Sequence, residues 1–459
     1  MTEPPTQVAP RLRARERVVV HVDTVAARWV GALALLIAGI WLTVERSPWS
    51  LTILAAVALI ARGIFLGRPV TAVHAVAAAA TVLAGFAAHL LAFDASGDVL
   101  VALSGLVLMW PTSAPPEPSQ LPRVWALVNA TRGDPLAPFA MQALKSYYFS
   151  TDGTAAIAYR TRLGYAVVSG DPIGDESRFA ELIGDFAGMC HTHGWRVVVL
   201  GCSERRLGLW RDPAVVGQTL RPVPIGRDVV IDVPTFDMVG RKYRNLRQAV
   251  QRTHNSGITT EIVAEREIDN RRLAELTDVL LSSAKGSRAE RGFSMILDGT
   301  LTGRYPGILL IIARDRAGQV QGFHRYAVAG RGSDITLDVP WRRRGAPNGV
   351  DERLSVDMIE AMRKSGAQRL SLAFAAFPEI FNDKERGPLR TFFYTAIHLG
   401  DALIALESLY RYLRKFHALG ARRYVLLPMT QVVPLLVVLL SLEFLPRRRQ
   451  LHPTVSASG

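Results

Sequence analysis

The sequence contains few of the residues that metal sites and disulfides need. Only two cysteines, Cys190 and Cys202, occur among 459 residues, and they form neither a C-x-x-C pair nor a zinc spacing. The histidines show no H-E-x-x-H pattern, and neither a G-x-x-x-x-G-K-[ST] loop nor a G-x-S-x-G elbow occurs. We therefore expect reduced structural thiols in a cytoplasmic compartment, no metal, no cofactor and no covalent serine mechanism.

Lysine is also rare, although basic charge is abundant. Only six of the 54 Lys and Arg residues are lysine, so each lysine calls for a specific reason. The formal net charge is +14, but residues 1–110 hold only 8 basic and 6 acidic residues. The remaining residues include 46 basic and 34 acidic ones, and this excess of 12 predicts an anionic partner for the later part of the chain.

Four hydrophobic runs lie near the N-terminus, after a basic tail over residues 1–26. Ala27–Val44 and Val70–Phe93 are each long enough to cross about 30 Å of hydrocarbon, whereas Leu51–Leu66 contains an arginine and Val99–Trp110 is short. Arginines precede the first run and separate the second from the third, while the third-to-fourth loop holds only acids. This pattern predicts a transmembrane region of three to four helices over residues 27–110. Four spans place the large domain in the cytoplasm, and three place it outside.

The proline-rich segment 111–124 breaks all periodicity and predicts a linker. From Thr154 onward short β-rich runs alternate with helical patterns, which predicts a mixed α/β domain with room for two similar halves around a shared cleft. The expected strands are 154–160, 165–169, 196–200, 228–233, 307–314, 320–328, 335–339 and 369–373, and the expected helices are 176–193, 236–253, 267–283, 350–364 and 389–416. The apolar run Val425–Leu445, followed by three arginines, predicts an interfacial helix or a fifth hydrophobic segment, with a basic tail to residue 459.

A strongly basic helix is expected within GRKYRNLRQAVQRTHNSG, residues 240–257. At about 100° per residue one arc carries only basic residues and the opposite arc is apolar, with Lys242 at the boundary between them. The basic arc consists of Arg241, Arg244, Arg247 and Arg252. No acid occurs between Arg241 and His254, so the like charges repel one another unless an anion joins them. We interpret this face as an anion-binding surface with phosphate as its natural target, the alternative being a merely solvated face.

Five stretches in a fixed order resemble a known family. They are YAVVSGDPIG (165–174), the basic helix, AERGFSM (289–295), NGVDERL (348–354) and SLYRYLRKF (408–416). Together they resemble the C-terminal domain of the phosphatidylglycerol lysyltransferases, the multiple peptide resistance factors, over residues 125–428. The resemblance is closest to the actinobacterial branch, some members of which carry a fused lysyl-tRNA synthetase that is not expected here.

The resemblance implies a fold, an activity and partners. The fold would be two GNAT-like halves following the transmembrane region. The activity would be transfer of an aminoacyl group, lysine by family, from aminoacyl-tRNA to a hydroxyl of phosphatidylglycerol or a related lipid at the cytoplasmic face of the cell membrane. The partners would be aminoacyl-tRNA, an anionic phospholipid and the membrane, and self-association into a homo-oligomer stays open.

Transfer needs a proton acceptor and cationic or donor groups for the developing oxyanion. The matching motifs offer Lys415 as the cation, Glu352 as the acid at the start of a helix, and Asp171 as a holder of the aminoacyl amino group. Each acid also has a structural reading: a favourable interaction with the helix dipole for Glu352, and an Asp-Pro turn for Asp171. The expected substrate-binding residues are Arg241, Lys242, Arg244, Arg247, Glu290, Asn348, Gly349 and Arg411.

One departure from the family pattern and two rival functions accompany this interpretation. After Phe416 the family commonly continues with proline, tryptophan and a second proline, whereas this chain has HALGARRY, so the lipid acceptor is open. RRRGAP, residues 342–347, nearly matches the pyrophosphate loop of a GNAT acyltransferase that uses acyl-CoA. The other rival is a non-catalytic membrane protein that binds anionic lipid or nucleic acid through its basic face.

Overall fold

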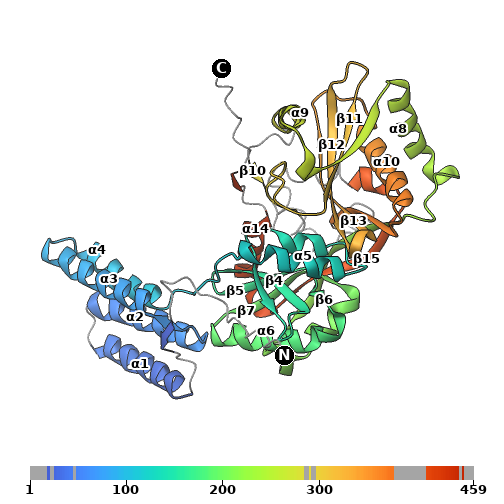
Figure 1. Cartoon of the computed structure of the whole chain (residues 1–459). Coiled ribbons are helices and arrows are strands. Elements are labelled where there is room, and N and C mark those ends of the chain that lie inside the picture. Colours follow the sequence, from blue (N-terminus) through green and yellow to red (C-terminus); the bar gives the residue numbers. More distant parts are fainter. Residues whose placement is uncertain are drawn as a thin grey trace, which may run out of the picture.

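A computed structural model describes residues 18–20, 25–44, 48–283, 289–290, 296–376, 410–443 and 447–448. Four N-terminal helices project from one end of a larger α/β domain (Figure 1). They are α1 (Val25–Val44), α2 (Pro48–Phe65), α3 (Ala72–Leu90) and α4 (Asp94–Leu108). We call these four helices the bundle.

Small residues let the bundle helices approach one another closely. A Cβ atom on Gly105 of α4 would collide with the carbonyl oxygen of Ala56 in α2, and one on Gly97 would lie 2.8 Å from the carbonyl oxygen of Gly85 in α3. Helices that pack in lipid commonly meet at such small residues, because dispersion between close backbones replaces the hydrophobic effect.

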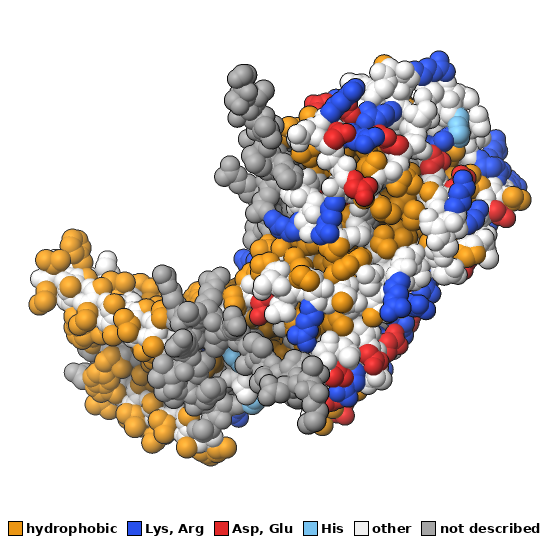
Figure 2. All heavy atoms as spheres, in the orientation of Figure 1, with side chains coloured by type: hydrophobic (Ala, Val, Ile, Leu, Met, Phe, Trp, Pro, Cys, Tyr) orange, Lys and Arg blue, Asp and Glu red, His pale blue; other side chains and the backbone are white. Residues whose placement is uncertain are grey.

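Only two described helices, α1 and α3, are long and apolar enough to cross a membrane. Within these two, 11% and 17% of the apolar window is buried, so most of their hydrophobic side chains face outward, and Figure 2 shows that hydrophobic surface. The two other predicted spans also form helices, but both are short. By the length criterion that α1 and α3 meet, α2 falls among the shorter apolar helices. Helix α4 has 15 residues, fewer than the about 20 that span a bilayer.

The segment predicted as a linker is bound along the surface of the α/β domain. The indole Nε1 of Trp195 donates to the carbonyl oxygen of Thr112 at 3.0 Å, and the Ala114 amide donates to Thr161 Oγ1 at 2.7 Å. The backbone amide of Glu117 then donates to the carbonyl oxygen of Lys145 at 3.0 Å. The last residues of the segment are helical, because α5 (Leu121–Ala130) begins before the predicted end of the linker. Several hydrogen bonds therefore hold the linker against the domain.

One 12-stranded mixed sheet runs through the whole α/β domain. Its path is β3 (Ser146–Phe149), β4 (Ala155–Arg162), β5 (Tyr165–Ser169), β7 (Arg196–Ser203), β15 (Leu419–Leu427), β8 (Arg221–Asp232), β14 (Arg369–Ala376), β13 (Asp334–Arg342), β12 (Val320–Ala329), β11 (Ile308–Arg314) and β9 (Thr259–Ala264), with β6 (Ile173–Gly174) beside β4. Two separate pairs join β1 (Val18–Val20) to β2 (Val70–Thr71) and β10 (Ala289–Glu290) to β16 (Arg447–Arg448).

The order of elements repeats within the sheet. In the first half β4 and β5 form a hairpin, α6 (Phe179–Thr192) crosses over, and β7 returns parallel to β5. In the second half β12 and β13 form a hairpin, α10 (Val350–Lys364) crosses over, and β14 returns parallel to β13. The sequence left room for two similar halves, and the sheet contains them.

Each half is completed by a strand that lies outside it in sequence. β8 follows the first half in the chain but pairs with β14 of the second half. β15 follows the second half but pairs with β7 of the first. β8 and β15 also pair with each other, so the two exchanged strands form the centre of the continuous sheet.

Apolar helix faces cover both halves. α6 places Phe179, Ile183 and Phe186 in the core of the first half. In the second half α8 (Arg244–Asn255) and α10 share one core, and α9 (Asn270–Ser282) covers another. The short helix α7 (Pro213–Val216) and α14 (Val432–Glu443) pack on the first half.

Several predicted boundaries are wrong. The helix predicted over 236–253 begins at Arg244 after a 3-10 turn, because Thr235 turns the chain by bonding to Asp232 and Gly240 adopts a φ of 90°. The apolar run 425–445 is not one segment, since β15 continues to Leu427 before α14 starts. Of the helix predicted over 389–416, residues 389–409 lie outside the described residues, and 410–414 are helical.

Candidate active site

The N-terminus of α10 is held against α8 by a glycine. Gly349 caps α10 with a φ of 105°, a conformation that disfavours other residues. A Cβ atom there would collide with the carbonyl oxygen of Ala249 in α8. Gly349, predicted to bind substrate, thus has a structural role in the described fold, and Asn348 before it is exposed.

Glu352 and Lys415 lie in direct contact, although they are 63 positions apart in sequence. Glu352 stands in the first turn of α10 and is only 6% exposed, while Lys415 follows the helical turn 410–414. The Lys415 ammonium donates to Glu352 Oε1. The Lys415 side chain is 33% exposed, so this cation is supported by a buried carboxylate and still reaches solvent.

A buried polar network continues from this pair along the same two elements. Ser355, one turn after Glu352, bonds to the hydroxyl of Tyr412, one turn before Lys415. The Tyr326 hydroxyl lies 3.4 Å from Ser355 Oγ and 3.4 Å from His324 Nδ1. Burial raises the pKa of Tyr412 well above its usual value, so this phenol stays neutral. The network fixes the distance between α10 and the turn that carries Lys415.

Asp351 connects the network to the loop before α10. His324 Nε2 lies 3.2 Å from Asp351 Oδ1, and Arg342 Nη1 lies 3.5 Å from Asp351 Oδ2. The His324 ring is fully buried. A carboxylate next to one ring nitrogen fixes the orientation and the tautomer of an imidazole.

Asp171 lies in a different cluster from the Glu352–Lys415 pair. Its Oδ1 accepts the Ser203 amide at 2.9 Å, and its Oδ2 lies 3.5 Å from Arg423 Nη1. Arg423 also contacts Asp134 Oδ1 at 2.6 Å and Asp228 Oδ2 at 2.8 Å. Since Arg423 is on β15 and Asp228 is on β8, this cluster of one arginine and three aspartates lies where the exchanged strands meet.

Burial raises the pKa of two aspartates beside Arg423, Asp171 and Asp228. Burial raises the pKa of Asp228 to about 6, and the positive charge of Arg423 opposes that rise. Burial also raises the pKa of Asp171, and the negative charge of Asp134 adds to it. At Asp171 and Asp228, burial and the repulsion between carboxylates outweigh the attraction of Arg423, so proton binding is favoured at these two residues.

The basic arc, which runs from the 3-10 turn at residues 241–243 into α8, is on the surface, as predicted. Arg241, Lys242, Arg244 and Arg252 are exposed, and the apolar arc is buried through Leu246, Ala249 and Val250. Arg247 is exposed too, but it donates to the carbonyl oxygens of Met238 and Gly240 and so closes the turn before the helix. Within the described part of the chain none of these five cations forms an ion pair.

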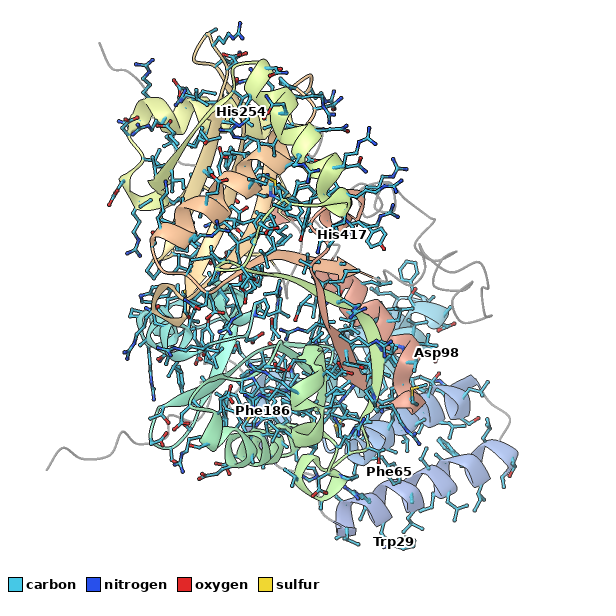
Figure 3. The ribbon with its side chains drawn as sticks, turned by 90° about the vertical axis from the view of Figure 1, so that its right-hand side faces the viewer. Trp29, Phe65, Asp98, Phe186, His254 and His417 are labelled. Carbon is cyan, nitrogen blue, oxygen red and sulfur yellow. The ribbon has the colours of Figure 1, made fainter. Side chains whose placement is uncertain are left out.

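The basic helix and the bundle lie at opposite ends of the molecule. Figure 1 shows α8 at the upper right and the bundle at the lower left. In Figure 3 His254, on the last turn of α8, lies at one end, and Trp29, Phe65 and Asp98 of the bundle lie at the other. His417, two residues after Lys415, lies between them. A ligand bound on α8 therefore approaches from the side away from the bundle.

The remaining predicted site residues contribute less to this picture. Arg411 is exposed on the turn that leads to Lys415. Glu290 contributes its backbone to β10, opposite Arg447. Two observations disfavour binding of an acyl-CoA pyrophosphate by the loop at residues 342–347. Arg342 contacts Asp351, and Arg343 contacts Asp278 at 2.6 Å. Two acids also occupy the first turn of α10, where a pyrophosphate needs positive charge.

Sequence reasoning missed His324, Tyr412 and Arg423 as members of buried polar clusters. The partners of each come from distant elements, so no local spacing reveals them. The sequence gives one signal for Arg423: this charged residue stands just before an apolar run.

Comparison with known proteins identifies the relatives of this chain. Residues 125–427 match the family described as phosphatidylglycerol lysyltransferase, C-terminal. The MprF-like domain protein Rv1619 of Mycobacterium tuberculosis is 67% identical over 462 residues, which cover 98% of this chain and 96% of that protein. The lysylphosphatidylglycerol biosynthesis bifunctional protein LysX of Rhodococcus jostii is 29% identical over 80% of this chain, and the match spans only 31% of LysX.

Solved structures of low sequence identity share the fold. A C-terminal domain ascribed to a lysylphosphatidylglycerol synthetase of Agrobacterium fabrum has a TM-score of 0.59 and 20% identity, covering 71% of this chain and 98% of that one. L-PGS of Bacillus licheniformis has a TM-score of 0.59 and 19% identity, covering 71% and 96%. The α/β domain thus has the mixed-sheet fold of these two solved domains. The chain belongs to the phosphatidylglycerol lysyltransferase C-terminal family.

Proposed function

We propose that this protein transfers an aminoacyl group from aminoacyl-tRNA to a hydroxyl of phosphatidylglycerol or a related anionic lipid. The single observation that carries the proposal is the Lys415–Glu352 pair at the start of α10, in the motifs that define the family resemblance. Lysine is the amino acid that we propose, because LysX and the Agrobacterium fabrum domain are named for lysylphosphatidylglycerol.

The Lys415–Glu352 pair has the charges that acyl transfer requires. The lipid hydroxyl attacks the ester carbonyl, its proton leaves to a base, and the ribose oxygen departs with a proton after the C–O bond breaks. We assign the Lys415 ammonium to the developing oxyanion, where a preorganised donor stabilises charge most. Glu352 holds that ammonium in place and is the nearest carboxylate to accept the proton. The role of Asp171 in holding the aminoacyl amino group stays a prediction.

The position of α8 favours nucleic acid over lipid as the ligand of the basic arc. A lipid phosphate stays at the bilayer, whereas α8 lies at the end of the molecule away from the bundle. A polyanion in solution can reach that end, and exposed arginines are suited to phosphate backbones. We therefore propose α8 as the contact for tRNA and the bundle side as the source of lipid.

The proposed location is the cell membrane, with the α/β domain facing the cytoplasm, where aminoacyl-tRNA occurs. The apolar helices α1 and α3 support membrane insertion. A multi-pass arrangement fits the helical hairpins α1–α2 and α3–α4. An acceptor held in the same bilayer as the enzyme is present at a high effective concentration.

The test is lipid analysis of membranes containing the protein, supplied with radiolabelled aminoacyl-tRNA and phosphatidylglycerol. A new labelled lipid that migrates as a cation and disappears after ribonuclease treatment supports the proposal and identifies the amino acid. Label in no lipid, together with retained tRNA or lipid binding, would instead support the non-catalytic binding protein.

A further inference from the structure

Helix α14 is apolar on both of its faces. Leu435, Val438 and Leu442 are at most 1% exposed and pack on the sheet beside Tyr165 and Val425. The opposite stripe is hydrophobic and open to solvent: Val433 is 77% exposed, Val437 59% and Leu440 43%. A surface helix of a soluble domain normally shows polar residues on that side.

The outward stripe extends beyond the helix and contains no charge. Met429, in the turn just before α14, is 58% exposed, and Pro434 is exposed beside Val433. Between Met429 and Leu442 the sequence has no Asp, Glu, Lys or Arg, whereas Arg447, Arg448 and Arg449 follow shortly after. An apolar stripe flanked by arginines is typical of a segment that lies in the headgroup region of an anionic bilayer.

Contacts place the start of α14 beside the base of the bundle. The Tyr165 hydroxyl donates to Gln431 Oε1 at 2.8 Å, at the residue that precedes α14. Burial raises the pKa of the same Tyr165 phenol, and the positive charges of Arg196, Arg68 and Arg62 oppose that rise, so the end of α2 and the α2–α3 turn lie close to it.

Backbone contacts hold the α2–α3 turn against the same part of the first half. A Cβ atom on Gly194 would lie 2.5 Å from the carbonyl oxygen of Gly67, and one on Gly164 would lie 3.5 Å from Arg68 Nη2. The bundle therefore cannot move freely relative to α14.

We propose that the outward stripe of α14, consisting of Met429, Val433, Pro434, Val437 and Leu440, lies in the cytoplasmic leaflet of the bilayer that the bundle enters. The occupant is a lipid surface rich in anionic headgroups, rather than another protein. This inference deepens the proposed function, because it depends on insertion of α1 and α3 in a membrane. It gives the α/β domain a second attachment to the bilayer and so one fixed tilt over it.

Depth-dependent fluorescence quenching tests the proposal on the full chain in nanodiscs that contain phosphatidylglycerol. One cysteine at a time carries an environment-sensitive fluorophore at Val433→Cys, at Val239→Cys, or at Leu83→Cys on α3. Val239 is 73% exposed and matches Val433 in residue type and exposure, but it lies next to the basic helix. Cys190 and Cys202 are buried, and burial raises the pKa of both thiols, so the unchanged protein measures background labelling.

We expect a spin-labelled lipid to quench the Val433 fluorophore at least about threefold more than the Val239 fluorophore, and iodide to show the reverse order. Quenching of Leu83 by lipid together with full access of iodide to Val433 overturns the docking of α14 and leaves the membrane insertion of α3 intact. Absence of lipid quenching at Leu83 overturns that insertion, which the proposed function requires. A Val433 fluorophore shielded from both quenchers shows that protein, such as a second copy, covers the stripe, and this also overturns the proposal.

Discussion

Replacing Lys415 with methionine separates the chemical role of this cation from its structural one. The change keeps the length of the side chain but leaves the carboxylate of Glu352, which is 6% exposed, without its ammonium partner. Breaking a fully buried ion pair costs about 3–5 kcal/mol. Because the Lys415 side chain is 33% exposed, we expect a smaller loss of about 2–3 kcal/mol in the free energy of unfolding.

The double substitution Lys415→Met with Glu352→Gln tests that reasoning. Removing both charges should recover about 1–2 kcal/mol of the stability lost in the single variant, because no uncompensated charge is left buried. Transfer activity should fall by about 10²–10³-fold in the single variant, because the donor to the oxyanion is missing, and at least as far in the double variant, which also lacks the Glu352 carboxylate. Lys364→Met, an exposed lysine at the end of α10, serves as the control and should keep full activity.

The outcome that would refute this reasoning is specific. A Lys415→Met protein with activity within about threefold of the unchanged protein would remove Lys415 from the reaction. A double variant no more stable than the single one would show that the Glu352 carboxylate is not held by that ammonium. Activity is measured as label transferred to lipid, and stability as denaturant unfolding in detergent.

Three further predictions concern other parts of the α/β domain. Gly349→Ala should destabilise the protein by about 2–4 kcal/mol, because the residue has a φ of 105° and a Cβ atom would meet α8; unchanged thermal unfolding would contradict this. The double substitution Arg241→Gln with Arg244→Gln should weaken tRNA binding. The slope of log affinity against log salt concentration should fall in magnitude by about 1 for each phosphate that is no longer neutralised. An unchanged slope would exclude α8 as the tRNA-binding surface. Asp338→Asn should flatten the pH dependence of stability. Burial raises the pKa of Asp338 to about 7. The contribution of this carboxyl to stability is therefore present below its ordinary pKa and is lost as the pH rises to about 7, by up to about 1.4 kcal/mol per pH unit. A variant with the same pH slope in unfolding measurements would contradict this.

Local sequence patterns predicted the elements whose signal is contained in a short segment. The strand predicted over 165–169 and the helix predicted over 350–364 have the same bounds in the structure. Both have unbroken periodicity and clear ends, since glycine follows the strand and precedes the helix. The contact of Lys415 with Glu352 could be expected only through the family motifs, because no spacing connects residues so far apart.

Long-range pairing could not be predicted from the sequence. β15 was missed because Arg422 and Arg423 interrupt its apolar pattern, and a buried arginine in a strand is tolerated only where carboxylates surround it. Those carboxylates, Asp134 and Asp228, come from other elements. β9 was missed because it lies at the end of the sheet, where its side chains are only partly buried.

The exchanged strands determine how the chain can be divided. A fragment that ends before β8 would keep β7 but leave its edge unpaired, since the partner strand β15 is encoded more than two hundred residues later. A fragment that begins after β8 would likewise expose the edge of β14. Such open edges promote aggregation. A fragment that ends before β8 should therefore stay soluble only when it is co-expressed with the fragment that carries β8 and β15, because β15 supplies the missing partner of β7.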